Sequence, residues 1–219
     1  MQADELHTRP NDALRAMWSD RLVKLGFAAE GEGLRAAARA SQPDARGIAF
    51  ALLGFGGDRD AVAVVREGLE DSYPPARVEA ARAAVLLGDD DARSVLRALL
   101  DCDWPETALN AAAYLADLGD PCGFPVLAAA ATSEVDALRL QATLLARAFL
   151  PHASADIDVV ALLRRAALDE ASPMIRREAV YQVARLDDEV RREILSRAAS
   201  DPAPTVARAA QARVEGPVT

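Results

Sequence analysis

Apolar and polar positions alternate in blocks that return about every 31 residues along the chain. A segment of about 14 residues, small and apolar with a few charges, occurs six times and is separated by polar turns. The segments read ARGIAFALLGFGGD, ARVEAARAAVLLGD, TALNAAAYLADLGD, ALRLQATLLARAFL, IRREAVYQVARLDD and VARAAQARVEGPV, beginning at Ala45, Ala76, Thr107, Ala137, Ile175 and Val206. Their starts lie 31, 31, 30, 38 and 31 residues apart. Such a regular step indicates an internal structural repeat.

Each segment has the periodicity of an amphipathic helix. In the second one, Val78, Ala81, Val85 and Leu86 recur at three- to four-residue steps, which places them on one buried helical face. About 12 residues before the second position of each segment, another apolar residue lies within a second helix-like run. These residues are Leu34, Val65, Leu96, Val126 and Leu195. The fifth unit has Arg164 there, so we expect Leu162 and Leu163 to shift and cover the core.

Proline-rich turns separate the two predicted helices of each unit. Examples are SQPD at 41–44, DSYPP at 71–75 and DPAP at 201–204. Proline lacks a backbone donor and disfavours helix in the residue before it, so it opens one helix or ends the other. Each unit is therefore a helix hairpin too small to bury its own apolar faces, and the units must stack.

The pattern resembles the HEAT family, and in particular the short HEAT-like repeats of phycobilisome lyases, whose second helix typically reads VRxxAxxALxxLGD. The match is carried by residues 76–89 and by YLADLGD at 114–120, and the resemblance extends over about residues 31–214. It implies an all-α fold, a right-handed α-solenoid of about six HEAT-like helix hairpins with an N-terminal capping helix. We expect residues 1–30 to hold the cap and residues 31–219 to form one continuous repeat array.

The same resemblance implies a ladder of acid–arginine pairs, because HEAT repeats carry an Asp six residues before an Arg. Asp71 with Arg77 has this spacing, and Glu170 with Arg176 has it with a longer acid. Ala108 and Leu138 occupy the Arg position in units three and four, so an incomplete ladder is predicted.

Two stretches depart from the repeat period. Residues 11–27 place Leu14, Met17, Trp18, Leu22 and Leu25 on one helical face, which predicts a helix covering the first repeat. Residues 151–157 supply the extra residues of the long step, and a loop insertion between units four and five is the simplest interpretation.

The composition of the chain disfavours nucleic-acid binding, membrane binding and a metal site. The formal charge of −9 and the pI of about 4.8 disfavour a protein that neutralises phosphates or an anionic membrane surface. Cys102 and Cys122 form no CxxC pair and His7 and His152 are far apart, so no metal site is predicted. No secretion signal or long apolar span is recognised, and we expect a cytoplasmic protein without membrane contact.

No catalytic motif or cofactor signature is found, so no catalytic residue and no cofactor are predicted. The glycines Gly54, Gly56 and Gly57 fall where a repeat closes its helix. The alternative is a HEAT-like repeat enzyme or nucleic-acid-binding protein, of the DNA glycosylase or bilin-lyase type. Trp104 with its neighbouring acids is the feature that would serve a glycosylase, although a turn position and the acidic chain disfavour that role.

The predicted binding surface follows the second helices, which in HEAT arrays line the concave side. Its positions are small and apolar in the first unit, as in Gly47, Ala51 and Phe55, and become basic and aromatic towards the C-terminus. The predicted partner-binding residues are Arg139, Arg147, Arg177, Tyr181 and Arg185. Arg and Tyr dominate protein–protein hot spots, so the expected partner is another protein, contacted through an acidic segment, and nucleic acid is disfavoured. The expected role is a non-catalytic interaction scaffold or adaptor.

Overall fold

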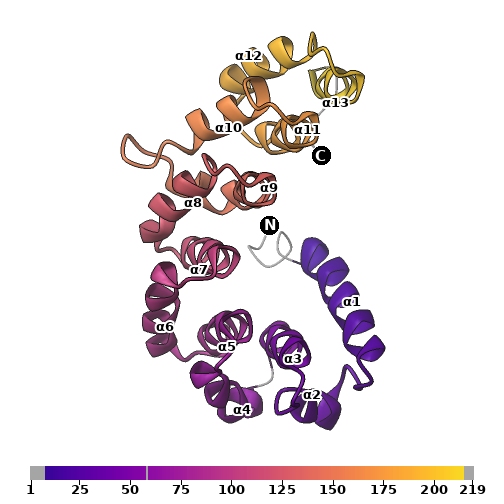
Figure 1. Ribbon diagram of the computed structural model, residues 1–219, viewed down its shortest axis with the longest axis vertical. Helices are drawn as coiled ribbons and strands as arrows, with labels where there is room; N and C mark the ends of the chain where they lie inside the picture. The colour runs from indigo at the N-terminus through magenta and orange to yellow at the C-terminus, as the bar shows by residue number, and fades with distance from the viewer. Residues whose placement is uncertain (1–7, 58, 215–219) are drawn as a thin grey trace. The chain divides into compact units, whose positions relative to one another are not determined.

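The computed structural model describes residues 8–57 and 59–214, and side chains from residue 12 onward. Within these residues the chain has helices and turns and no strand (Figure 1). The predicted all-α fold is therefore confirmed. The chain divides into two compact units, residues 1–107 and 108–219, each of which is described by itself.

The long helix α1 spans Thr8–Lys24 and is followed by six helix pairs. The pairs are α2 (Gly31–Ala37) with α3 (Pro43–Gly56), α4 (Val62–Glu67) with α5 (Pro74–Leu86), α6 (Arg93–Ala98) with α7 (Pro105–Asp117), α8 (Phe124–Ala130) with α9 (Asp136–Leu145), α10 (Val159–Leu168) with α11 (Pro173–Val183) and α12 (Asp188–Ala198) with α13 (Pro204–Val214). Short 3-10 turns extend several first helices, and one of them, η7 (Ala146–His152), follows α9.

Proline opens five of the six second helices, as the turns predicted, and α9 begins at Asp136 instead. Proline suits the first helical position because its missing N–H would have no intrahelical partner there. The helix starts show that the predicted register of unit four was one residue too early. Arg139, and not Leu138, is the fourth residue of α9, as Arg46 is in α3 and Arg176 in α11.

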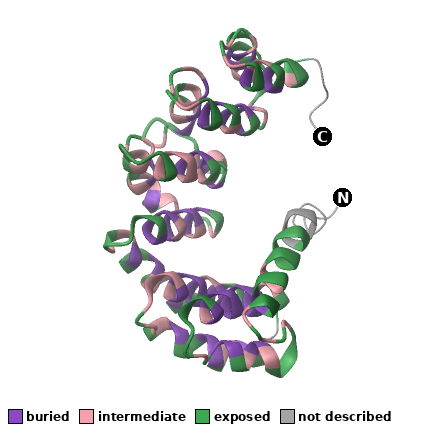
Figure 2. Ribbon diagram, turned by 45° about the vertical axis from the view of Figure 1, so that its right-hand side comes forward, coloured by how far each residue is buried: buried purple, intermediate pink, exposed green. Residues whose placement is uncertain are grey.

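The same shift corrects the core of α8. Leu127, and not Val126, is fully buried at the position that Leu34, Leu96 and Leu195 occupy in their units. In α10, Leu163 is fully buried beside Arg164, as predicted, and Leu162 is half-buried. The buried residues follow the inner faces of the helix pairs (Figure 2), which gives a core of mostly Ala, Leu and Val.

The predicted cap helix packs more lightly than its apolar stripe suggested. α1 contacts α3 and buries Leu22 completely, whereas Leu14 and Met17 remain 36% and 57% exposed. The stripe is therefore core only near its C-terminal end. The predicted boundary at residue 30 stays a prediction.

The glycines at the end of α3 have two different roles. Only Gly57 has a positive φ, 64°, and ends the helix as a left-handed C-cap. Gly54 lies inside α3 against α5, where an added Cβ would be 2.9 Å from the Cα and Cβ of Ala83. Gly54 is therefore a packing residue, and its missing side chain lets α3 and α5 approach closely.

Candidate functional site

A ladder of ion pairs links successive helix pairs within each half of the chain. One of the predicted partner-binding residues, Arg139, belongs to it. In residues 1–107, the Arg46 guanidinium makes a bidentate pair with Asp71, at 2.6 and 2.7 Å, and also donates to the Ala40 carbonyl oxygen. In residues 108–219, Arg176 pairs in the same way with Asp201, at 2.7 and 2.9 Å. Each arginine thus joins the acid of the following turn, which is the between-unit pairing that the HEAT resemblance implies. The within-unit pair of Arg176 with the Glu170 carboxylate is not formed, and Arg176 donates to the Glu170 carbonyl oxygen instead.

Arg139 is the third described rung. Its Nε and one terminal nitrogen donate to the Glu170 carboxylate, both at 3.0 Å, and its other terminal nitrogen donates to the Ser133 carbonyl oxygen. The Arg139 side chain is only 15% exposed and that of Glu170 10%. The prediction that Arg139 is an exposed partner-binding residue is not supported by this geometry, because its donors are used within the repeat stack.

The pairing sets the protonation of the ladder acids. Burial by itself raises the pKa of Glu170, but hydrogen bonds from Arg139 and from the Ser172 backbone outweigh it and leave the pKa below its ordinary value. The Asp201 pKa is lowered chiefly by the hydrogen bonds from Arg176. Both acids are therefore charged at neutral pH, and the ladder belongs to the scaffold.

One rung is incomplete. The repeat register aligns Arg77 with Arg46, and Cys102 occupies the position of the acid Asp71 in the following turn. The Cys102 thiol donates to the Trp104 carbonyl oxygen, and the Arg77 Nε is buried with no hydrogen-bond partner among the described residues. A buried donor without a partner costs stability, so this rung weakens the ladder.

The other predicted binding residues are exposed and lie on or just after two neighbouring helices, α9 and α11. Arg177 and Tyr181 lie on α11 and Arg185 follows its end, whereas Leu144 lies on α9 and Arg147 follows it. All five side chains are exposed; Leu144 is 40% exposed and Tyr181 36%. We call Leu144, Arg147, Arg177, Tyr181 and Arg185 the Arg–Tyr face. The structure thus leaves four of the five predicted residues exposed on and just after two neighbouring helices. In the corrected register Leu144 aligns with Tyr181, whereas Arg147 no longer aligns with Arg185.

The arginines of the Arg–Tyr face differ from several first-helix arginines in their pairing. No carboxylate of the described residues pairs with Arg147, Arg177 or Arg185. Arg213 stacks over the Tyr181 ring, with its guanidinium carbon 4.0 Å from the ring centre, and adds another positive charge. On the first helices, in contrast, Arg164 pairs with Glu193 at 2.8 Å and Arg191 with Asp188. The Arg–Tyr face therefore has unbalanced positive charge on a chain that is acidic overall.

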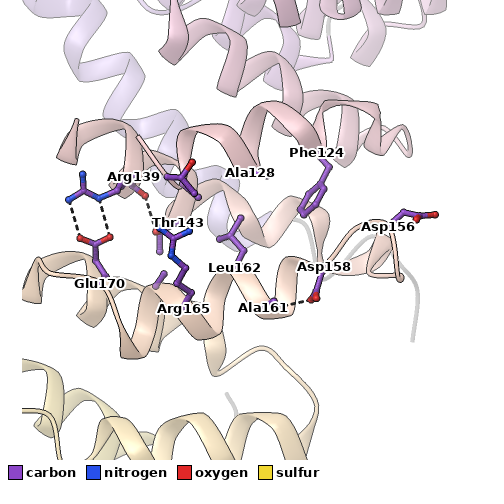
Figure 3. Close-up of a pocket in the computed structure, with 13 residues that line it drawn as sticks. Phe124, Ala128, Arg139, Thr143, Asp156, Asp158, Ala161, Leu162, Arg165 and Glu170 are labelled. Carbon is purple, nitrogen blue, oxygen red and sulfur yellow. Dashed lines mark hydrogen bonds and ion pairs between the residues drawn. The ribbon is translucent and has the colours of Figure 1, made fainter. Parts of the chain in front are cut away.

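A second candidate site is a cavity of about 340 Å³ between α8, α9 and α10 (Figure 3). Its walls are mostly apolar and include Phe124, Ala128 and Leu162, and its polar groups include Arg139, Thr143, Arg165 and Glu170. Sequence reasoning found the 151–157 insertion beside this cavity but gave no sign of the cavity itself.

Trp104, the residue that would serve a glycosylase, lies in a turn. Its ring packs edge-to-face on Tyr73, with 5.5 Å between ring centres, and it remains 44% exposed. The contact gives Trp104 a structural role in its turn. In the part of the chain that the structure describes, no group of three or more His, Cys, Asp and Glu residues is placed to hold a metal ion. None of the described helices has the length and apolar character needed to cross a bilayer.

Comparisons with known proteins agree with the repeat fold. Residues 31–113 match the family model of HEAT repeats. No curated protein sequence matches the chain. An engineered protein solved by a structural genomics consortium has 17% identity and a TM-score of 0.52, covering 84% of this chain and 94% of that one.

Two further solved structures are similar at lower TM-scores. The complex of CpcE and CpcF of phycocyanin lyase from Nostoc sp. has 19% identity and a TM-score of 0.46, covering 92% of this chain and 86% of that one. Human deoxyhypusine hydroxylase in complex with glycerol has 17% identity and a TM-score of 0.35, covering 98% and 90%. The chain therefore contains HEAT repeats over residues 31–113, and its later helix pairs have the same all-α repeat fold.

Proposed function

We propose that this protein is a non-catalytic adaptor that binds an acidic segment of another protein on the Arg–Tyr face. The observation that carries the proposal is the set of three exposed arginines without carboxylate partners among the described residues. They lie on or just after the neighbouring helices that carry exposed Leu144 and Tyr181. The first-helix arginines Arg164 and Arg191 are, in contrast, already paired.

Physical reasons favour a protein partner with both acidic and apolar side chains. Arg and Tyr supply large, partly apolar contact areas, and such residues contribute most of the binding energy at protein interfaces. A carboxylate that meets an arginine lacking a partner gains a charge-assisted hydrogen bond, often a bidentate one. Leu144 adds an apolar contact, so a purely polyanionic ligand would leave part of the face unused. The proposal places this interaction in the cytoplasm, where Cys102 and Cys122 remain thiols.

The test is charge reversal on the face, with Arg147, Arg177 and Arg185 changed together to Glu. The probe is a fluorescently labelled synthetic peptide of Glu residues with interspersed Leu, and its binding is followed by fluorescence anisotropy. We expect binding to the wild type and loss of binding to the variant. The helical circular dichroism signal and the Tm should stay nearly unchanged, because exposed charges contribute only about 0–1 kcal/mol each.

A matched control reverses three first-helix arginines, half-buried Arg164 and exposed Arg192 and Arg197, which changes the net charge equally. This variant should bind the peptide like the wild type, apart from a small general charge effect. Equal losses in both triple variants would mean that net charge, and not the Arg–Tyr face, attracts the peptide. Tight binding of plain duplex DNA, with affinity falling steeply as salt rises, would favour the nucleic-acid-binding alternative.

A further inference from the structure

The cavity between α8, α9 and α10 lies where the repeat period is interrupted. Residues 146–158 connect α9 to α10, whereas only residues 118–123 connect α7 to α8. In α10, Arg164 takes the position of a core leucine but turns outward to Glu193, and Leu163 is buried in its place. A longer connection and a changed core residue therefore coincide where α8 and α10 border this cavity.

The cavity has the construction of a small-molecule site. Its volume of about 340 Å³ lies at the small end of the usual range for ligand pockets, about 300–1,000 Å³. The apolar wall is formed by Phe124, Ala128, Ala131, Leu162 and Ala166. Phe124 is held in place by a tilted contact with buried Phe149, with 5.7 Å between ring centres. A preformed apolar wall with few polar groups is typical of sites for compact organic molecules.

The polar groups of the cavity differ in how many of their hydrogen-bond donors and acceptors remain available to a ligand. Arg139 and Glu170 satisfy each other, and Asp158 accepts a hydrogen bond at 2.9 Å from the Ala161 N–H at the start of α10. Thr143 donates its hydroxyl proton to the Arg139 carbonyl oxygen, so its oxygen can only accept from a ligand. Arg165 has no carboxylate partner among the described residues. In Figure 3 its guanidinium extends from α10 towards Thr143, across the middle of the site.

The centre of the cavity favours a negatively charged ligand group, and the end near Phe124 disfavours one. Arg165 at its centre favours one anionic group, because a guanidinium presents paired donors that fit a carboxylate. Asp156 and Asp158 lie at the end near Phe124, away from Arg139 and Glu170 (Figure 3). These two acids disfavour a second negative group at that end, since like charges repel at short distance.

We propose that this cavity binds a small organic monoanion, with its carboxylate on Arg165 and an aromatic or aliphatic body against Phe124, Ala128 and Leu162. The site is separate from the Arg–Tyr face, and none of the cavity-lining residues belongs to that face. The inference therefore does not depend on the proposed adaptor function.

The experiment uses isothermal titration calorimetry on the full chain with three probes of similar size. 4-Phenylbutyrate is the monoanion, its primary amide is the neutral analogue, and suberate is the dianion. We expect 4-phenylbutyrate to bind at least about tenfold more tightly than either of the others, because a hydrogen-bonded charge contributes about 1.5–3 kcal/mol, or more than tenfold.

Two variants test the position of the ligand. Arg165→Gln should weaken 4-phenylbutyrate binding about tenfold or more and remove the preference over the amide. Ala128→Leu should weaken all three probes by filling the cavity, while circular dichroism verifies that the helices persist. Arg192→Gln on α12 is the matched control and should leave binding unchanged.

The proposal is overturned if none of the probes binds at concentrations up to about 10 mM, or if binding is the same in Arg165→Gln and Ala128→Leu as in the wild type. It is also overturned if only the acidic Glu–Leu peptide responds to Arg165→Gln, because the cavity would then be part of a protein-binding surface. If the acidic peptide fails to bind the Arg–Tyr face, the adaptor proposal fails, but the expected binding of 4-phenylbutyrate in the cavity is unaffected. The two proposals therefore fail separately.

Discussion

Helix α3 uses for packing two repeat positions that are exposed on α11. On α3, Gly47 and Ala51 are buried, and Gly47 faces the backbone of α5. At the equivalent places α11 carries Arg177 and Tyr181, both exposed. Small side chains let two helices approach until the surface between them closes, whereas long side chains remain above the contact in solvent. Side-chain size at these positions therefore decides whether they contribute to the core or to the exposed surface.

The largest expected contrast is between two aromatic residues on second helices. Phe50 on α3 is 1% exposed, so Phe50→Ala should lower the free energy of unfolding by about 3–5 kcal/mol. Tyr181→Ala on α11 removes a ring that is 36% exposed and should cost less than about 1 kcal/mol. Urea unfolding followed by circular dichroism measures both, and similar costs would mean that the Tyr181 ring is packed in the core.

A smaller contrast separates two glycines of α3. Gly54→Ala would place a methyl group 2.9 Å from Ala83, and the resulting overpacking should cost about 1–3 kcal/mol. At Gly56 an added Cβ meets nothing within 4 Å, so Gly56→Ala should be neutral or stabilise by up to about 1 kcal/mol. Thermal unfolding of the two variants compares them directly. A stable Gly54→Ala variant would mean that α3 and α5 can separate freely.

The ladder predicts a pH-dependent contribution to stability. Asp201→Ala leaves Arg176 without its acid and should cost about 1–3 kcal/mol at pH 7. The Asp201 pKa is lower in the folded chain than its ordinary value of 3.8. The stabilisation from its pairing with Arg176 is therefore fully present above pH 3.8 and is lost as the pH falls through the folded pKa. The difference between wild type and variant in urea unfolding should therefore shrink from pH 7 to about pH 2. The exposed acid Asp90 is the control, and Asp90→Ala should change little at either pH.

The smallest expected effect is a gain at the incomplete rung. Cys102→Asp gives the unpartnered Arg77 Nε an acceptor and should raise the free energy of unfolding by about 0.5–1.5 kcal/mol. The gain should vanish when Arg77 is also changed to Ala. Cys122→Asp, which introduces the same charge at the other, exposed cysteine, should give no such gain. A gain that persists without Arg77 would mean that the register linking residues 77 and 102 is wrong.

The repeat pattern of apolar residues located most helix pairs correctly but misplaced the register of unit four. The repeat step predicted the helix pairs and buried Leu96 and Leu195, because a helical face that packs must be apolar every three to four residues. It placed unit four one residue too early, since Leu138 and Arg139 both fit an amphipathic helix and the apolar period alone does not separate them. That error classed Arg139 as a binding residue and left out Leu144. It also hid the rung of Arg139 with Glu170, because Leu138 was taken to occupy the arginine position of that unit.

The sequence by itself determined the all-α repeat, the order of its helix pairs and the type of residue on each face, because these follow from local periodicity and from proline at the helix starts. Only the tertiary structure decided which arginines are paired and which are exposed, because pairing requires an acid from another unit within hydrogen-bond distance. The same is true of the cavity beside Arg165. Its walls come from α8, α9 and α10, and the space between helices is set by side-chain volumes packed in three dimensions, which no spacing along the chain specifies.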